Sequence, residues 1–342
     1  MPRAPIQEKI IMNRLRTRAL TAAVALAAAA GLLAACGTTE EKTDTGAPAA
    51  TSSGPVTVTD SRGKAVELKA PAKRVVGLEW GELEMLVSLG IQPVGAADPK
   101  GYATWVTAAP LPADVKDVGT RQEPSVDSIV ALQPDLVVME AERDAPLVTQ
   151  LEKYVPVIVT KGSDASDNLG RMRSDLNMIA QATGTTDKAT ALLAELDKAI
   201  ADGKAKIEAA GNAGKGYAMA DGWKQGSAIS VRMYGKGALV SELATAVGLT
   251  NVWTGKVDAA WGLGTTDVEG LLAVKDADAT FFYNASDGND VFADGLTGNK
   301  IWESLNFVKN KQVTKLPAGI WTFGGPKSCM QYINELVKAY GA

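Results

Sequence analysis

Aromatic side chains that could bind an organic ligand stand in glycine- and proline-rich stretches of this 342-residue sequence. Trp261 lies in Ala-Ala-Trp-Gly-Leu-Gly, and Trp321 and Phe323 lie in Gly-Ile-Trp-Thr-Phe-Gly-Gly. Because such stretches offer little local core, we expect these rings to line a ligand cleft, although capping the edge of a core is the alternative. Tyr102 and Trp105 stand in a proline-containing stretch, where both interpretations are equally open.

Arg121 is the basic residue that best fits such a cleft. It lies between a predicted strand and a predicted helix, in Asp-Val-Gly-Thr-Arg-Gln-Glu-Pro. Ligands of open α/β sheets bind at strand ends of this kind. A guanidinium there offers a fixed fork of donors to an oxygen-rich ligand. The alternative is a surface arginine paired with Glu123.

Catalysis and direct metal capture are disfavoured by composition. The sequence has no histidine, which excludes Ser-His-Asp sites, Cys-His sites and every histidine-based metal site. The glycines around Lys236 lack the phosphate-binding pattern Gly-Lys-Ser/Thr. A net charge of −4 argues against a nucleic-acid partner. We therefore expect no enzyme, no cofactor and no protein-bound metal, with a lipid-anchored enzyme as the less favoured class.

Two acidic residues open predicted helices in matching contexts. Asp127 begins Asp-Ser-Ile-Val-Ala-Leu, and Glu269 begins Glu-Gly-Leu-Leu-Ala-Val. An acid in a first helical turn stabilises that helix by about 0.3–1 kcal/mol, which is sufficient reason for either one. Two acids at equivalent places in two similar halves also suit a partner that carries paired basic sites.

The N-terminus predicts export. Arg14, Arg16 and Arg18 precede an apolar run over 20–33, which is short for a membrane span and typical of a signal peptide. The run ends in Leu-Ala-Ala-Cys, which resembles a bacterial lipobox and implies that Cys36 is lipidated and becomes the mature N-terminus. A chance cysteine after an ordinary signal peptide is the alternative.

Short β-rich runs alternate with amphipathic runs from residue 74 onward, which predicts βα units and largely parallel sheets. Strands are expected at 74–78, 93–96, 135–139, 155–160, 215–219, 228–233, 279–283 and 312–316. Helices are expected at 83–89, 126–132, 239–247, 268–274, 301–305 and 326–340, with a loop at 102–112. Apolar residues near 3.6-residue spacing over 185–210 predict one long helix, whose central place suits a bridge between two lobes.

The predicted organisation has five parts. Residues 1–35 are a lipoprotein signal peptide, although Met1 and Met12 are both possible starts. Residues 36–54 are a flexible tether, because their polar composition cannot bury a core. An N-terminal α/β lobe over 55–184, a bridging helix over 185–211 and a C-terminal α/β lobe over 212–342 complete the chain. The remaining cysteine, Cys329, is expected to be a buried free thiol.

Several of these segments together resemble a known family. Residues 74–95, which begin Arg-Val-Val-Gly-Leu-Glu-Trp-Gly, are similar to the opening of the iron-siderophore and cobalamin binding proteins of ABC importers. The likeness continues through 102–105, 117–124 and 131–138 and, in the second half, through Gly-Ile-Trp-Thr-Phe-Gly. It covers about residues 55–342 and is strongest to the ferric-hydroxamate binders.

The resemblance implies two α/β lobes joined by one long helix, as in class III solute-binding proteins, with the ligand in a shallow cleft between them. Trp105, Arg121, Trp261, Trp321 and Phe323 match positions that line this cleft. We expect only small lobe closure across such a bridge.

The same resemblance adds lesser candidates and two departures. Phe323 stands where the hydroxamate binders usually have a tyrosine, and Arg143 follows the 135–139 strand where they carry another. Arg143, Arg232 and Tyr234 are candidates by position, as is Tyr102. Asp127 and Glu269 match the two acids that dock on arginines of the membrane permease.

The expected function is therefore that of a monomeric substrate-binding lipoprotein, anchored on the outer face of the cytoplasmic membrane. It would capture a ferric siderophore of hydroxamate type and deliver it to an ABC permease and its ATPase. Iron would stay in the chelate. Catecholate or citrate-type siderophores, haem and cobalamin are the alternative ligands.

Overall fold

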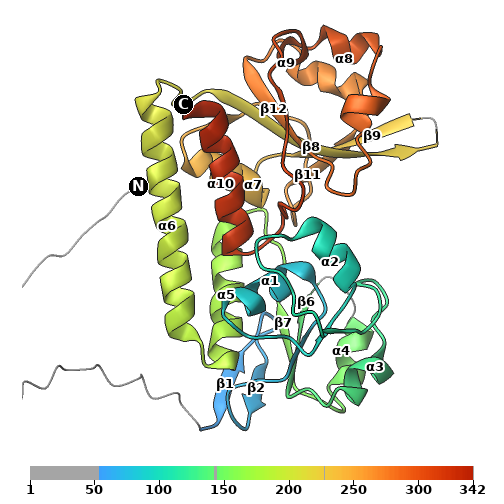
Figure 1. Cartoon of the computed structure of the whole chain (residues 1–342), viewed down its shortest axis with the longest axis vertical. Helices are drawn as coiled ribbons and strands as arrows, with labels where there is room; N and C mark the ends of the chain where they lie inside the picture. Colours follow the sequence, from blue (N-terminus) through green and yellow to red (C-terminus); the bar gives the residue numbers. More distant parts are fainter. Residues whose placement is uncertain (1–53, 142–144, 227, 342) are drawn as a thin grey trace, which may run out of the picture. The chain divides into compact units, whose positions relative to one another are not determined.

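The computed structural model describes residues 54–141, 145–226 and 228–341. In this part of the chain, two α/β lobes are joined by the long helix α6, Thr186–Ala209 (Figure 1). The expected fold is thereby confirmed. The predicted signal peptide, the lipidated Cys36 and most of the predicted tether lie outside the described residues.

The N-terminal lobe is built on a five-stranded parallel sheet in the order β5-β4-β3-β6-β7. Its interior strand β6 is Leu-Val-Val-Met-Glu and is buried at every position, as expected for a parallel strand covered on both faces. An antiparallel hairpin of β1 and β2 precedes the sheet. The strands are β1 (Val56–Thr59), β2 (Ala65–Leu68), β3 (Val75–Gly77), β4 (Gly95–Ala96), β5 (Lys116–Asp117), β6 (Leu136–Glu140) and β7 (Val157–Thr160).

The helices of this lobe are α1 (Trp80–Ser88), α2 (Pro99–Trp105), α3 (Val126–Ala131), α4 (Ala145–Leu151) and α5 (Asn168–Thr183). Helix α2 corrects the expected loop over 102–105, whereas 106–112 contain no helix or strand, as expected. Asp98 accepts a hydrogen bond from the Gly101 amide at 3.0 Å, and Pro99 occupies the first turn, so the proline starts a helix here. Helix α5 was not among the expected elements; Gly184, at φ +66°, ends it.

The C-terminal lobe contains a six-stranded sheet in the order β11-β9-β8-β12-β13, with β10 also paired to β8. The expectation of a largely parallel sheet holds here except at β9, which is antiparallel to both of its neighbours, β8 and β11, and so runs against the other strands. Strands β10, β12 and β13 complete the sheet through parallel pairs. The strands are β8 (Gly216–Gln225), β9 (Ala228–Tyr234), β10 (Thr250–Asn251), β11 (Leu263–Thr266), β12 (Ala279–Asn284) and β13 (Val313–Lys315).

Short helices cover this sheet, and the last helix returns to the lobe junction. The predicted helix over 268–274 is the 3₁₀ helix η1 rather than an α-helix. The helical elements are α7 (Leu239–Ala246), η1 (Glu269–Val274), the π-helical turn η2 (Val291–Gly295), α8 (Lys300–Ser304), α9 (Asn306–Lys309) and α10 (Pro326–Tyr340). Helix α10 lies along α6 (Figure 1).

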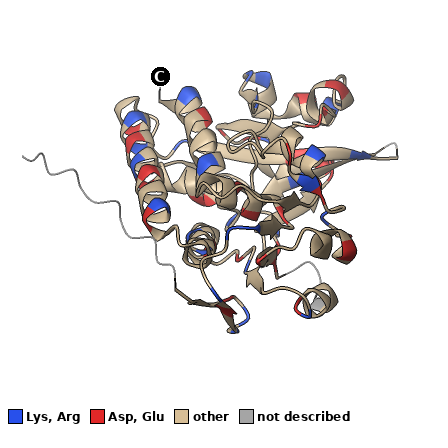
Figure 2. Cartoon of the chain, turned by 60° about the horizontal axis from the view of Figure 1, so that its bottom comes forward, with Lys and Arg blue, Asp and Glu red and all other residues tan. Residues whose placement is uncertain are grey.

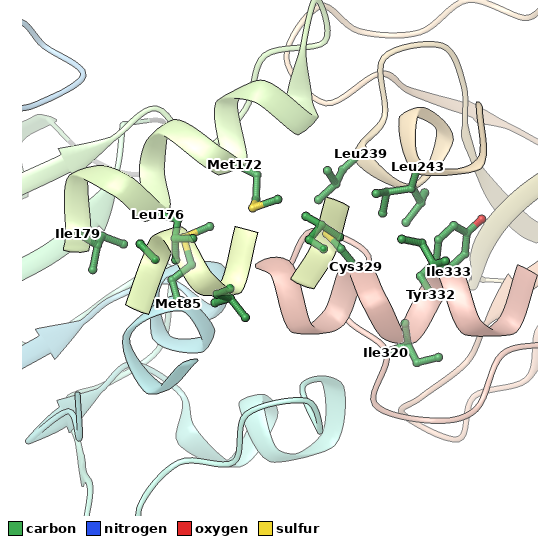
Figure 3. Packing of buried hydrophobic residues seen from close by; sticks show 14 of the residues in the cluster. Met85, Met172, Leu176, Ile179, Leu239, Leu243, Ile320, Cys329, Tyr332 and Ile333 are labelled. Atoms are coloured by element: carbon green, nitrogen blue, oxygen red, sulfur yellow. The ribbon is translucent and has the colours of Figure 1, made fainter. Parts of the chain in front are cut away.

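One hydrophobic core runs through the junction of the lobes. Met85 of α1 and Leu176 of α5 belong to the same buried cluster as Leu243 of α7 and Ile333 of α10 (Figure 3). The long helix adds Leu196 to it. Because close-packed interiors resist deformation, a shared core of this kind favours a fixed arrangement of the two lobes.

Charged residues of both signs are interspersed along the ribbon, including along α6 (Figure 2). Within the described ranges, every helix is too short or too polar to cross a membrane.

Candidate ligand-binding cleft

A cleft of about 370 Å³ lies between the lobes. This volume falls within the range of small-molecule sites. The N-terminal lobe supplies Glu79, Trp80, Gly81, Glu82, Met85, Trp105, Arg121, Glu140, Gly162 and Arg171. The C-terminal lobe supplies Asp221, Arg232, Trp261, Leu263, Trp321, Thr322 and Phe323.

Five aromatic rings form a continuous wall across both lobes. Trp321 contacts Trp80 at 5.0 Å and Trp105 at 6.0 Å between ring centroids. Phe323 contacts Trp321 at 5.1 Å and Trp261 at 5.2 Å. All four contacts are edge-to-face, a geometry worth about 0.5–1.5 kcal/mol per pair beyond burial. The wall therefore offers an apolar, preformed surface to a ligand.

Arg121 is stacked on this wall and held by a carboxylate. Its Nε donates to Glu79 Oε2 at 3.0 Å, and its Nη2 lies 2.8 Å from Glu79 Oε1. The guanidinium carbon is 4.1 Å from the Trp80 ring centroid. This bidentate pair leaves Nη1 to donate to a ligand. The alternative pairing with Glu123 is wrong, because that position is exposed and Arg121 turns towards the cleft.

Arg232 forms the matching pair in the other lobe. It lies directly opposite Asp221 on the antiparallel strands β9 and β8, and its Nε donates to Asp221 Oδ1 at 2.9 Å. The Tyr234 hydroxyl donates to Asp221 Oδ2, also at 2.9 Å. Burial lowers the pKa of the Arg232 guanidinium, but Tyr234 and Asp221 outweigh it, so the net pKa is raised and the arginine stays charged.

The floor of the cleft carries a buried carboxylate and a third arginine. Glu82 is 2% exposed and accepts a hydrogen bond from the Thr160 hydroxyl at 2.6 Å. Burial, with repulsion from Glu79, raises the pKa of Glu82 to about 7. Arg171 donates from Nη1 to Asp175 at 3.3 Å, whereas its buried Nε and Nη2 have no hydrogen-bond partner among the described residues.

The structure brings most of the predicted ligand-binding residues together. Trp105, Arg121, Trp261, Trp321 and Phe323 all line the cleft. Arg232, a lesser candidate by position, lines it as well.

Three candidates fall elsewhere. Tyr102 does not lie in the cleft, so that prediction is corrected: its ring is fully buried in a cluster with Leu83 and Val106, and its hydroxyl donates to the Ala109 carbonyl at 2.5 Å. Tyr234 stands behind the cleft wall rather than in it, and contacts Phe323 at 5.6 Å. Arg143 lies outside the described residues.

Sequence reasoning missed the carboxylates that pair with the arginines and the residues that form the floor of the cleft. Glu79, Trp80 and Glu82 follow strand β3 directly, so the strand-end rule that singled out Arg121 applied to them equally. Asp221 and Arg171 gave no comparable signal. One lies inside a strand and the other inside an unpredicted helix.

Asp127 and Glu269 are both exposed, in the first turn of α3 and of η1 respectively. Neither contributes to the cleft. In the part of the chain that the structure describes, no group of three or more cysteine, aspartate or glutamate side chains is arranged to hold a metal ion.

The fold and the cleft define a two-lobed ligand-binding protein, and comparison with known proteins gives its family. Residues 75–319 match the periplasmic binding protein family. The chain is 29% identical over 271 residues to the iron(3+)-hydroxamate-binding protein FhuD of Escherichia coli (strain K12), which covers 78% of this chain and 87% of that protein. The chain therefore belongs to the periplasmic binding protein family.

Two further comparisons agree. The chain is 31% identical over 282 residues to the Fe(3+)-citrate-binding protein YfmC of Bacillus subtilis (strain 168), covering 82% of this chain and 84% of that protein. Its fold is similar to that of the Fe3+-Desferal bound siderophore binding protein FhuD from Vibrio cholerae, with a TM-score of 0.69 and 24% identity. That match covers 79% of this chain and 98% of the other.

Proposed function

We propose that this protein captures a ferric siderophore in the cleft between its lobes and delivers it to the permease of an ABC importer. The observation that carries the proposal is the composition of the cleft. An aromatic wall from both lobes surrounds arginines whose charge is already balanced by carboxylates. The related proteins named for ferric hydroxamate and ferric citrate support the class of ligand.

The charge of the cleft favours an uncharged chelate, and hence the hydroxamate type. Arginines do not outnumber carboxylates among the described cleft residues. The arginines are Arg121, Arg171 and Arg232, and the carboxylates are Glu79, Glu82, Glu140 and Asp221. Three hydroxamate monoanions neutralise Fe³⁺, whereas three catecholate dianions leave a net charge of −3. Burying a trianion beside the described arginines costs desolvation that is only partly offset, because each of these arginines is already paired with a carboxylate.

Binding is physical rather than chemical in this account. The indole faces of Trp261 and Trp321 cover the apolar surface of the chelate, and Arg121 donates from Nη1 to the oxygens that bind iron. The iron keeps its chelator, so the protein supplies no ligand to it. Phe323 lacks the hydroxyl of a tyrosine and contributes only apolar area and ring contacts.

The rest of the proposed function concerns delivery. The proposal includes residues 1–35 as a signal peptide, lipidation of Cys36, residues 36–54 as the tether, and lobes over 55–184 and 212–342 joined by the helix of 185–211. Asp127 and Glu269, exposed on separate lobes, would dock on arginines of the permease. The protein acts as a monomer with no catalytic activity of its own.

Tryptophan fluorescence of the soluble form, residues 37–342, tests the ligand. Saturable quenching by ferric hydroxamates at submicromolar concentration, and not by their iron-free forms, is expected. Arg121→Ala and Trp261→Ala should weaken the binding that this quenching reports, whereas Glu67→Gln, an exposed change on β2, should not. A response only to ferric catecholates, haem or cobalamin would overturn the hydroxamate assignment, and no response to any of them would overturn the function.

A further inference from the structure

Two helices at the lobe junction have their N-termini capped by a carboxylate from the opposite lobe. The first carboxylate is Glu84 of α1, which is fully buried. Its Oε2 accepts a hydrogen bond from the Gly325 amide at 3.0 Å, and its Oε1 accepts one from the Ser328 amide at 2.9 Å. Helix α10 has no capping side chain of its own, so Glu84 supplies its cap from the other lobe.

The second carboxylate reverses this arrangement. Glu242 of α7, in the C-terminal lobe, accepts hydrogen bonds from the Asn168 amide at 3.1 Å and the Leu169 amide at 2.5 Å. These amides open α5, in the N-terminal lobe. Because the N-terminus of a helix carries partial positive charge, a carboxylate is favoured at both places.

Both caps lie next to the cleft. Glu84 is on the same helix as Trp80 and Glu82, and the amide of Gly325 is two residues beyond Phe323. The backbone of Phe323 also lies close to α1, since a Cβ on Gly81 would be 3.2 Å from its carbonyl oxygen. The Glu84 cap therefore fixes the aromatic segment of one lobe against the first helix of the other.

The Glu242 cap acts on the floor of the cleft in the same way. It holds the first turn of α5, and Arg171 follows that turn directly. The Asn168 side chain adds a bond across the junction, from Nδ2 to the Gly237 carbonyl at 2.7 Å.

We propose that Glu84 and Glu242 are positioning residues that hold the two walls of the cleft at the spacing that binds the ligand. The proposal rests on the proposed function for the ligand, but its structural part concerns the ligand-free protein. Other contacts cross the junction too, such as the Thr107 amide to the Gly319 carbonyl at 2.9 Å. Loss of one cap should therefore loosen the junction without unfolding the chain.

Glutamine substitutions remove the caps with little change in volume. Each glutamate accepts two amide N–H groups, whereas a glutamine offers one oxygen and turns its own NH₂ towards the other N–H group. The matched control is Asn299→Ala. Asn299 caps α8 through the Ile301 amide at 3.0 Å and the Trp302 amide at 3.1 Å, and all three residues belong to the C-terminal lobe.

The distance between the lobes is the decisive measurement. Spin labels on cysteines at Tyr154 (65% exposed) and Leu272 of η1 (45% exposed) report it by pulsed electron paramagnetic resonance. Cys329 is buried and should not be labelled. We expect one narrow distance distribution in the parent protein and in Asn299→Ala. Glu84→Gln and Glu242→Gln should each broaden it, and the double variant should broaden it further.

Ligand affinity is the second readout. Each single variant should bind a ferric hydroxamate about fivefold more weakly, because loss of a cap lowers the fraction of molecules with a binding-competent cleft. Saturating ligand should restore the narrow distribution. Lower melting temperatures with unchanged distances and affinities, as expected for Asn299→Ala, would overturn the proposal.

The two proposals fail in different ways. If the parent protein binds no siderophore, the proposed function fails, while the ligand-free distances still test the role of the caps. Glu242 is partly exposed, so Glu242→Gln carries the test if the Glu84 variants do not fold.

Discussion

Replacing Glu82 by glutamine should stabilise the protein above neutral pH and leave its stability unchanged in acid. Glu82 is almost completely buried in the floor of the cleft, where its bond from Thr160 offsets only part of the cost of ionisation. Glutamine keeps an oxygen that can accept this bond and removes the charge. The variant therefore isolates the cost of ionising a buried carboxylate.

The magnitude follows from the pKa of Glu82, which burial and repulsion from Glu79 raise from 4.5 to about 7. This difference corresponds to about 3 kcal/mol. Below pH 4.5 the residue is protonated in both the folded and the unfolded state and contributes nothing. Between pH 4.5 and 7 only the folded state keeps the proton, so stability falls as pH rises, and the full cost is present above pH 7.

Thermal melting at pH 4.5 and pH 8, for the parent protein and the variant, measures this effect. At pH 8 Glu82→Gln should melt several degrees higher, since about 2 °C per kcal/mol is typical of a chain of this size. At pH 4.5, where the unfolded carboxyl is half ionised, the two proteins should melt within about 1 °C of each other. The exposed control Glu67→Gln should follow the parent at both values. A Glu82→Gln variant that is no more stable at pH 8, or equally stabilised at both, would refute the reasoning.

Three further outcomes are expected. Tyr102→Phe should lower the free energy of unfolding by about 1 kcal/mol, because the Ala109 carbonyl loses its donor. Siderophore affinity should be unchanged, and weaker binding in titrations would show that Tyr102 contributes to the ligand site. Gly237→Ala should lower the melting temperature strongly, because φ is +86° and a Cβ would collide with the Ala165 carbonyl oxygen; an unchanged temperature would contradict this. The Cys329 thiol, whose pKa burial raises, should react with an aromatic disulfide reagent only after unfolding in urea, and reaction in native buffer would show that it is accessible.

Local patterns predicted the elements whose formation depends on neighbouring residues. Helix α10 has the expected bounds, Pro326–Tyr340, because its first-turn proline and amphipathic spacing are both local signals. The long helix α6 is likewise within a residue or two of its predicted span. Helix α2 was missed because a proline was interpreted as a loop signal, although Asp98 beside it was a capping signal.

Contacts between distant residues could not be predicted in this way. The Arg121 partner is 42 residues away in sequence, so the nearer Glu123 was considered instead. Glu84 caps an amide 241 residues further along, and no local pattern marks such a pairing. Trp261, Trp321 and Phe323 were found because loop glycines leave their rings without a local core. For Tyr102, in a proline-containing stretch, the cleft and the core were equally open, and it proved to be a core residue.

Crystals of the soluble form grown with a ferric trihydroxamate, and measured at the iron absorption edge, test the central claim most directly. The account predicts one anomalous iron peak in the cleft, beside Trp261, with Arg121 donating to the iron-bound oxygens and no protein atom in the iron coordination shell. An iron peak outside the cleft, or iron bound directly by cleft carboxylates such as Glu82, would contradict it.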